Sequence, residues 1–156
     1  MTRYKIFIPE PFPPEACAII EDVADVTVGV PDRAYSEAEL IEHVKDIHAL
    51  IITSRERITA RVIAGGRRLR VITKSGARPV NVDVEAAHRQ GITVTWTPGA
   101  NSPSVAEHAL ALMLTVAKRL FMVSARLRGG GWRDLSIVGT ELGGKTMGLI
   151  GFGSVG

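Results

Sequence analysis

Three glycines near the end of the chain have the spacing of a phosphate-binding turn. Gly151, Gly153 and Gly156 follow the short apolar run 147–150 in the order Gly-x-Gly-x-x-Gly. A buried strand followed by this turn and a helix N-terminus presents backbone N–H groups to a pyrophosphate, as dinucleotide binding requires. The alternative is an ordinary glycine-rich turn. The residues predicted to bind a cofactor here are Gly151, Gly153, Ser154, Val155 and Gly156.

Such a turn needs strands and helices to position it, and the chain alternates short apolar runs with helical patterns. The apolar runs predict strands at 4–8, 26–28, 49–53, 69–73 and 92–96. Helices are predicted between them at 14–23, 36–47, 59–64 and 82–89. Ser36 and Glu39 give the second helix a capping box. Five strands separated by helices are typical of a doubly wound, parallel α/β sheet.

Ligands of a doubly wound sheet bind beyond the carboxyl ends of its strands, near the point where the strand order reverses. The loops that follow Thr73 and Trp96 are therefore the predicted binding region of a first domain, 1–100. The stretch 97–103 is rich in helix breakers and marks the boundary to a second part, 101–156.

A long helix is predicted from Ser102 or Ser104 to Arg128. Pro103 suits the first helical position after Ser102, whereas Ser104 and Glu107 have the spacing of a capping box. Apolar residues occupy much of the circumference of this helix, so it needs neighbours on several sides. We expect a second subunit or further residues to cover it.

The composition is that of a soluble globular protein. Of the 156 residues, 46% are hydrophobic and 22% are charged, and the net charge is +3. The single cysteine, Cys17, excludes an intramolecular disulfide and fits a reducing compartment. The N-terminus lacks the apolar core of a signal peptide, and no run reaches the roughly 18 apolar residues of a membrane span. A cytoplasmic protein without a membrane partner is expected.

Five basic residues lie close together in the sequence between positions 67 and 78. Such a cluster can bind nucleic acid, but it is more often a solvated helix end or a pocket for a small anion. No zinc-ligand spacing, helix-turn-helix pattern or aromatic RNA-binding motif accompanies it, so no nucleic-acid partner is predicted. The residues are Arg67, Arg68, Arg70, Lys74 and Arg78.

Four stretches, taken in order, resemble the motifs of one family. They are 74–83, 97–108, Gly131–Trp132 and 141–156. These stretches are similar to those of the NAD-dependent D-isomer-specific 2-hydroxyacid dehydrogenases, in particular the members like D-3-phosphoglycerate dehydrogenase. The resemblance extends over essentially the whole chain, and four motifs in the expected order are far more specific than any one of them.

The resemblance implies a fold and an activity. Residues 1–100 would form a flavodoxin-like domain that binds substrate. Residues 101–156 would supply an interdomain helix and the first strand of a truncated Rossmann domain for NAD. In the family the long helix, here 102–128, commonly packs across a homodimer interface. The implied activity is hydride transfer between nicotinamide and a small 2-hydroxy or 2-keto acid, with 3-phosphoglycerate as one candidate.

The resemblance also implies roles for residues in the loop after the fourth strand. Ser75, Gly76 and Ala77 match the residues whose backbone N–H groups hold the substrate carboxylate, and Ala77 also matches a position near the nicotinamide. Arg78 stands where a glycine is usual, and it either contacts an anionic substrate group or points to solvent. Asn101 matches an asparagine at the domain cleft, with a helix cap or hinge residue as the alternative.

The implied chemistry needs an arginine as an electrostatic group and a histidine, tuned by a carboxylate, as acid and base. In the family all three lie beyond the glycine motif, so neither a catalytic residue nor a metal ligand is assigned here. The four histidines given no such role are His43, His48, His88 and His108. We therefore expect the N-terminal part of a dehydrogenase, inactive alone. The alternative is a small-acid-binding, regulatory or dimerisation module without catalysis.

Overall fold

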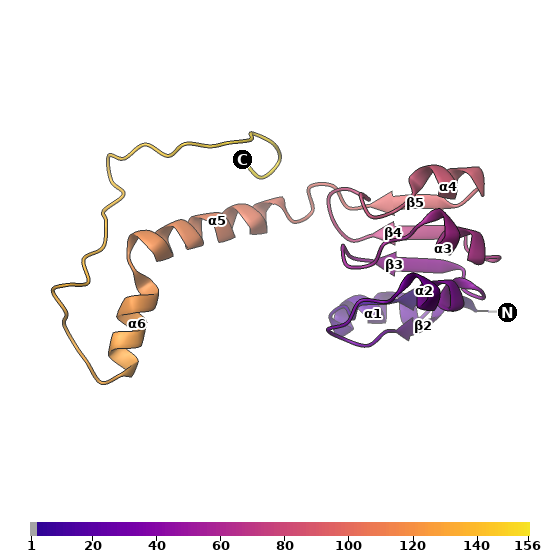
Figure 1. Ribbon diagram of the computed structural model, residues 1–156, viewed down its shortest axis with the longest axis horizontal. Helices are drawn as coiled ribbons and strands as arrows, with labels where there is room; N and C mark the ends of the chain where they lie inside the picture. Colours follow the sequence, from indigo (N-terminus) through magenta and orange to yellow (C-terminus); the bar gives the residue numbers. More distant parts are fainter. Residues whose placement is uncertain (1–2) are drawn as a thin grey trace. The chain divides into compact units, whose positions relative to one another are not determined.

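The computed structural model describes residues 3–156. The chain divides into two compact units, Met1–Ala100 and Asn101–Gly156. The first contains all the strands of the described chain, and the second contains two helices and a long coil (Figure 1).

A five-stranded parallel sheet forms the centre of the first unit. Its strands lie in the order β2-β1-β3-β4-β5, so the chain runs outward to one edge, returns and then continues to the other edge. This strand order is the flavodoxin-like one. It confirms the prediction of a doubly wound parallel sheet. The strands are β1 (Tyr4–Ile8), β2 (Ala24–Val28), β3 (Ala49–Ile52), β4 (Val71–Lys74) and β5 (Thr93–Trp96).

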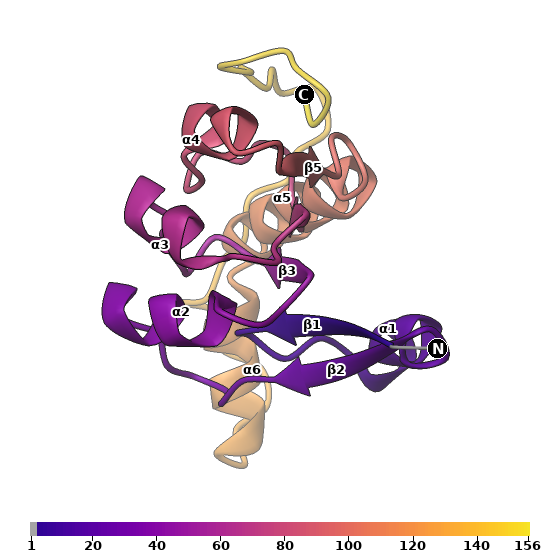
Figure 2. The ribbon, with the colours of Figure 1, turned by 90° about the vertical axis from the view of Figure 1, so that its right-hand side faces the viewer.

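Four helices connect the strands and lie on the two faces of the sheet. They are α1 (Pro14–Glu21), α2 (Glu37–Val44), α3 (Ala60–Gly65) and α4 (Val84–Arg89). Figure 2 shows α2, α3 and α4 on one face and α1 on the other. The core lies beneath α2, α3 and α4, where Phe7, Leu50 and Ile72 are buried. All the elements predicted within residues 4–96 are therefore present, with ends shifted by a few residues.

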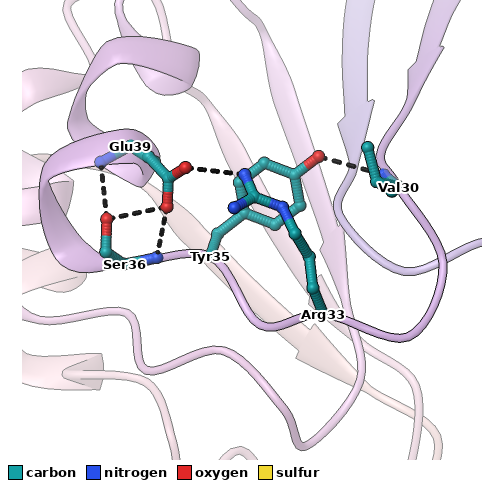
Figure 3. Close-up of polar contacts among 5 residues, drawn as sticks. All are labelled: Val30, Arg33, Tyr35, Ser36 and Glu39. Atoms are coloured by element: carbon teal, nitrogen blue, oxygen red, sulfur yellow. Dashed lines mark hydrogen bonds and ion pairs between the residues drawn. The ribbon is translucent and has the colours of Figure 1, made fainter.

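The capping box predicted for the second helix is present at the start of α2. The Glu39 N–H donates to Ser36 Oγ at 3.3 Å, and the Ser36 N–H donates to Glu39 Oε2 at 2.9 Å. The Arg33 guanidinium also donates to Glu39, at 2.6 Å (Figure 3). The bonds from Arg33 and Ser36 lower the pKa of the Glu39 carboxyl to about 2. The loop between β2 and α2 is thereby fixed at the helix N-terminus.

The prediction of one continuous helix from Ser102 or Ser104 to Arg128 is wrong. The structure has two helices, α5 (Ser102–Ala117) and α6 (Leu120–Arg128). Arg119 between them takes a left-handed conformation, with φ 51°. The Ala117 carbonyl, which a continuous helix would use internally, accepts the Thr140 N–H at 2.6 Å. The hydrogen bond from Thr140 therefore ends α5, a role that a glycine or a proline often has at the end of a helix.

The start of α5 also differs from both predicted caps. Asn101 occupies the N-cap position without a side-chain capping bond, and Ser102 is already helical. Pro103 lies in the first turn, where its missing N–H costs nothing. The Ser104–Glu107 capping box is not formed because Ser104 lies inside the helix.

The strand predicted at 147–150 is wrong as well. These residues are coil, and every strand among residues 3–156 belongs to the first unit. A strand is stabilised by the hydrogen bonds and side-chain packing of its neighbours, and the second unit has no other strand to supply them. Apolar composition alone therefore did not produce a strand here.

Many large apolar side chains of the second unit are exposed. Val116 and Phe121 are 77% and 78% exposed, and Ile150 and Phe152 are exposed still further. None of the helices in residues 3–156 has both the length and the apolar character needed to cross a bilayer. The predicted need for additional neighbours around 102–128 agrees with this exposure.

Candidate functional site

The loops after β4 and β5 lie together at the carboxyl edge of the sheet. β4 and β5 are parallel, with Lys74 opposite Trp96 at their last step. The predicted substrate residues Ser75, Gly76, Ala77 and Arg78 follow β4 directly. The structure thus brings these four residues to the edge at which doubly wound sheets bind ligands.

Two of the three predicted backbone donors are already used inside the protein. The Ser75 N–H donates to the Ile52 carbonyl at 2.8 Å, and the Gly76 N–H donates to Thr97 Oγ1 at 2.9 Å. Among residues 3–156, the N–H groups of Ala77 and Arg78 have no hydrogen-bond partner. The two adjacent donors available to a ligand are therefore those of Ala77 and Arg78, one position later than the sequence suggested.

Lys74, one of the five residues of the predicted basic cluster, lies at this edge. Its side chain is only 5% exposed, and its ammonium donates to the Ser75 carbonyl at 2.8 Å. A Cβ at Gly76, where φ is +138°, would collide with Lys74 Nζ, so the ammonium lies against the loop backbone. The signal was available, because the strand period of 2 puts Lys74 on the same buried face as Ile72.

The five-residue basic cluster does not exist as one patch. Arg67, Arg68 and Arg70 precede β4, whereas Lys74 and Arg78 lie at or beyond its other end. Four residues of strand separate the two groups by about 13 Å. Arg68 forms an ion pair with Asp46 at 2.9 Å. The contiguous footprint that nucleic-acid binding would use is therefore missing from this segment.

Lys74 and Arg78 differ from a third cation of the same edge. Arg55 is neutralised by an ion pair with Glu10 at 2.7 Å. Lys74 and Arg78 form no ion pair with any side chain of the described chain. A buried ammonium without a counter-ion is costly, so an anion at this loop would be stabilised.

A pocket of about 520 Å³ opens beside the loop. Ala77 and Arg78 form part of its wall, and Trp96 contributes an aromatic surface. The pocket is shallow and open to solvent, and most of its lining residues are apolar. Arg78 lines this pocket and is itself exposed, so the structure is compatible with both of its alternatives. The lining residues are Ala77, Arg78, Pro79, Val80, Trp96 and Pro98.

Asn81 holds the loop after β4 against the loop after β3. Its amide donates to the carbonyls of Thr53 at 3.0 Å and Glu56 at 2.6 Å. Glu56 is 1% exposed, and neither of its carboxylate oxygens has a hydrogen-bond partner in the described chain. Burial, aided by the charge of Glu10, raises the pKa of the Glu56 carboxyl. The sequence gives no sign that Glu56 is buried, because this residue stands between two arginines as surface residues do.

The glycine motif of the second unit has three different local geometries. Gly151 has φ +94°, which glycine adopts without strain. A Cβ at Gly156 would lie 2.7 Å from the Gly151 carbonyl oxygen, whereas a Cβ at Gly153 would meet nothing within 4 Å. The first glycine thus makes the turn, the third permits a close backbone approach, and the second leaves open space.

The predicted cofactor residues are divided between the two units. Ala77 belongs to the first unit, and Gly151, Gly153, Ser154, Val155 and Gly156 belong to the second. Asn101 is the first residue of the second unit and is exposed. Its side chain makes no capping bond to α5, so capping does not explain the choice of asparagine.

The sequence profile described as "D-isomer specific 2-hydroxyacid dehydrogenase, catalytic domain" matches residues 6–151. The chain belongs to this family. It is 35% identical to a hydroxypyruvate reductase of Thermotoga maritima over 156 residues, covering 100% of this chain and 50% of that protein. It is 38% identical to a D-3-phosphoglycerate dehydrogenase of Methanocaldococcus jannaschii over 152 residues, covering 97% of this chain and 28% of that protein.

The fold agrees with this assignment. A solved D-isomer specific 2-hydroxyacid dehydrogenase from Polaromonas sp. JS6 66, described as NAD-binding, superposes with a TM-score of 0.90 at 28% identity. The match covers 99% of this chain and 50% of that one. The chain therefore spans half or less of the length of these relatives. The family consists of oxidoreductases that act on small hydroxy acids.

Proposed function

We propose that this chain supplies the acid-binding loop and the start of the cofactor site of an NAD-dependent oxidoreductase. The reaction is hydride transfer between nicotinamide and C2 of a small 2-hydroxy or 2-keto acid. In this proposal residues 1–100 bind the acid and residues 101–156 begin the NAD-binding domain. Membership of the family and the loop at the carboxyl edge of the sheet support it.

One observation carries the proposal: two adjacent backbone donors, without partners among residues 3–156, belong to the same loop as the buried Lys74 ammonium. The N–H groups of Ala77 and Arg78 suit the two oxygens of a carboxylate, because successive N–H groups form an anion-binding concavity. Lys74 and Arg78 add positive charge that a second anionic group on the acid would neutralise. We therefore favour a phosphorylated acid such as 3-phosphoglycerate over a 2-hydroxy acid whose only anionic group is its carboxylate. Ser75 and Gly76 shape the loop that presents these groups.

The proposed cofactor site rests on the glycine motif. Gly151 and Gly156 make the turn and its close approach, and the open space at Gly153 leaves room for the pyrophosphate of NAD. Ser154 and Val155 would add backbone donors, and Ala77 would lie near the nicotinamide. When NAD is bound, its nicotinamide ring donates or accepts the hydride. Asn101 is proposed as a polar residue at the acid site.

Binding of the acid is tested by calorimetry on the 156-residue protein with D-3-phosphoglycerate and D-glycerate. Lys74→Met is expected to weaken 3-phosphoglycerate binding about tenfold, because a charge-assisted interaction is lost. D-Glycerate, which lacks the phosphate, should be affected less. Arg67→Met, at the other end of β4, is the matched control and should change neither affinity. If neither D-3-phosphoglycerate nor D-glycerate gives a heat of binding at millimolar concentration, the proposal is contradicted.

The 156 residues alone are expected to show no turnover. NADH oxidation measured with a panel of 2-keto acids tests this, and steady turnover by the chain would contradict it.

Exposed side chains of α5 and α6, including Val116 and Phe121, favour a second role as a homodimer interface. Light scattering over a concentration series should show a dimer, and a monomer at every concentration would exclude it. A cytoplasmic location stays a prediction.

A further inference from the structure

Thr97 fixes the glycine that precedes the two free donors. It is the first residue after β5, and its side chain and backbone both reach the Gly76 peptide. The Gly76 N–H donates to Thr97 Oγ1 at 2.9 Å, and the Thr97 N–H donates to the Gly76 carbonyl at 3.0 Å. Both polar groups of Gly76 are therefore held by one residue of the neighbouring strand end.

The bond to the Thr97 hydroxyl is not part of the regular sheet. β4 and β5 end at Lys74 and Trp96, and a parallel ladder would offer the next N–H only a backbone carbonyl. Gly76, at φ +138°, has left the strand conformation. The Thr97 hydroxyl supplies the acceptor that the ladder no longer provides.

The hydrogen bond of the Gly76 N–H to Thr97 determines which N–H groups of the loop are available to a ligand. With the Ser75 N–H on Ile52 and the Gly76 N–H on Thr97, the next two groups, on Ala77 and Arg78, are left at the pocket wall. Loss of the Thr97 hydroxyl would free the Gly76 N–H and allow the loop backbone to rotate. The anion would then meet a mobile set of donors instead of a fixed pair.

We propose that Thr97 is a positioning residue that orients the Ala77 and Arg78 N–H groups toward the carboxylate of the acid. This inference rests on the proposed function, because it assigns Thr97 to the same binding loop. Thr97 itself does not touch the acid. Its effect is exerted through the Gly76 peptide, and a serine hydroxyl at the same position would serve equally.

The chain offers a matched control on the same strand. Thr95 is also exposed, and its hydroxyl bonds to the Thr73 hydroxyl at 2.9 Å without reaching the loop. Thr97→Val and Thr95→Val each remove one hydroxyl that forms a cross-strand bond. Thr97→Ser keeps the hydroxyl and removes only a methyl group.

Calorimetry with D-3-phosphoglycerate tests the proposal on the full 156-residue protein. One lost hydrogen bond predicts a three- to tenfold weaker affinity, about 0.7–1.4 kcal/mol, for Thr97→Val. Thr97→Ser and Thr95→Val should remain within about twofold of wild type. Amide exchange at Gly76 in the ligand-free protein should rise in Thr97→Val and return toward wild type in Thr97→Ser.

The outcomes separate this inference from the proposed function. Wild-type binding together with equal binding by Thr97→Val would overturn the role of Thr97 and leave the acid site standing. Equal weakening by Thr95→Val and Thr97→Val would reduce the effect to general destabilisation of β5 and also overturn it. If wild type binds neither 3-phosphoglycerate nor glycerate, the proposed function and this inference fall together.

Discussion

The two units of the chain differ in where their apolar side chains lie. In the first unit Phe7 and Ile8 are each 1% exposed, and strands and helices surround them. In the second unit Phe152 is 88% exposed and Ile150 has no cover at all. An apolar pattern becomes a stable element only when the same unit supplies the surface that buries it. The two units therefore differ in how completely their apolar side chains are packed, although both have strongly apolar sequences.

Substitution of a buried leucine gives the largest expected effect. Leu50 in β3 is fully buried, whereas Leu135 in the second unit is 77% exposed. Leu50→Ala should lower the free energy of unfolding by about 2–5 kcal/mol because it leaves a cavity. Leu135→Ala should change it by less than about 0.5 kcal/mol. Urea titrations followed by circular dichroism measure both, and similar losses would contradict the contrast between the units.

The same contrast explains which elements the sequence predicts. The strands and helices of residues 4–96 are stabilised by one another, so periodicity and caps are enough to locate them. The run 147–150 has the right composition but no neighbouring strand. The break at Arg119 has no glycine or proline to announce it, because it is set by the contact between Thr140 and Ala117. Such contacts between distant residues are invisible to local patterns.

In the candidate site, too, local sequence patterns do not predict individual hydrogen bonds between distant residues. Motif resemblance locates the loop Ser75–Arg78, but the choice of free donors depends on the Thr97 hydroxyl, which comes from another strand. The burial of Lys74 follows from the strand period, which places it on the same face as Ile72. The burial of Glu56 has no local signal, because its neighbours Arg55 and Arg57 suggest a surface position.

Glu56 provides the second test, by pH. Its carboxyl is buried without a hydrogen-bond partner, and its pKa is raised above the ordinary value of 4.5. The unfolded chain therefore loses this proton first, and stability falls as pH rises from about 4.5 to the folded-state pKa. Glu56→Gln cannot ionise, so this decline should disappear. At neutral pH the variant should be more stable than wild type, because it removes a buried charge, although its amide would still lack hydrogen-bond partners.

Thermal unfolding between pH 4 and pH 8 measures this difference. The charged groups near Glu56 are Glu10, which raises its pKa, and Arg55, which lowers it. Glu85→Gln is the control, because Glu85 is exposed and forms only a long ion pair of 3.8 Å with Arg89. Parallel pH curves for wild type and Glu56→Gln would show that Glu56 is not buried as described.

The two Ser-x-x-Glu sequences of the chain allow a test of intermediate size. Ser36 and Glu39 form a capping box, whereas Ser104 lies inside α5 and caps nothing. Ser36→Ala should therefore cost about 1 kcal/mol of stability. Ser104→Ala should be neutral or slightly stabilising, because alanine has the higher helix propensity. A larger loss for Ser104→Ala would mean that Ser104 caps α5 in solution and that the helix begins at Val105.

Substitution of Arg119 gives the smallest expected change in stability. Glycine at position 119 and glycine at position 126, both in the second unit, are expected to change stability in opposite directions. A non-glycine residue at φ 51° costs about 1 kcal/mol, which glycine avoids. Arg119→Gly should therefore be neutral or stabilising by about 0.5 kcal/mol, after the larger entropy of glycine in the unfolded chain is counted. Arg126→Gly, inside α6, should cost about 1 kcal/mol and reduce helicity. If α5 and α6 formed one continuous helix in solution, both glycines would interrupt it. Equal losses of helical circular dichroism for the two variants would then replace the predicted difference.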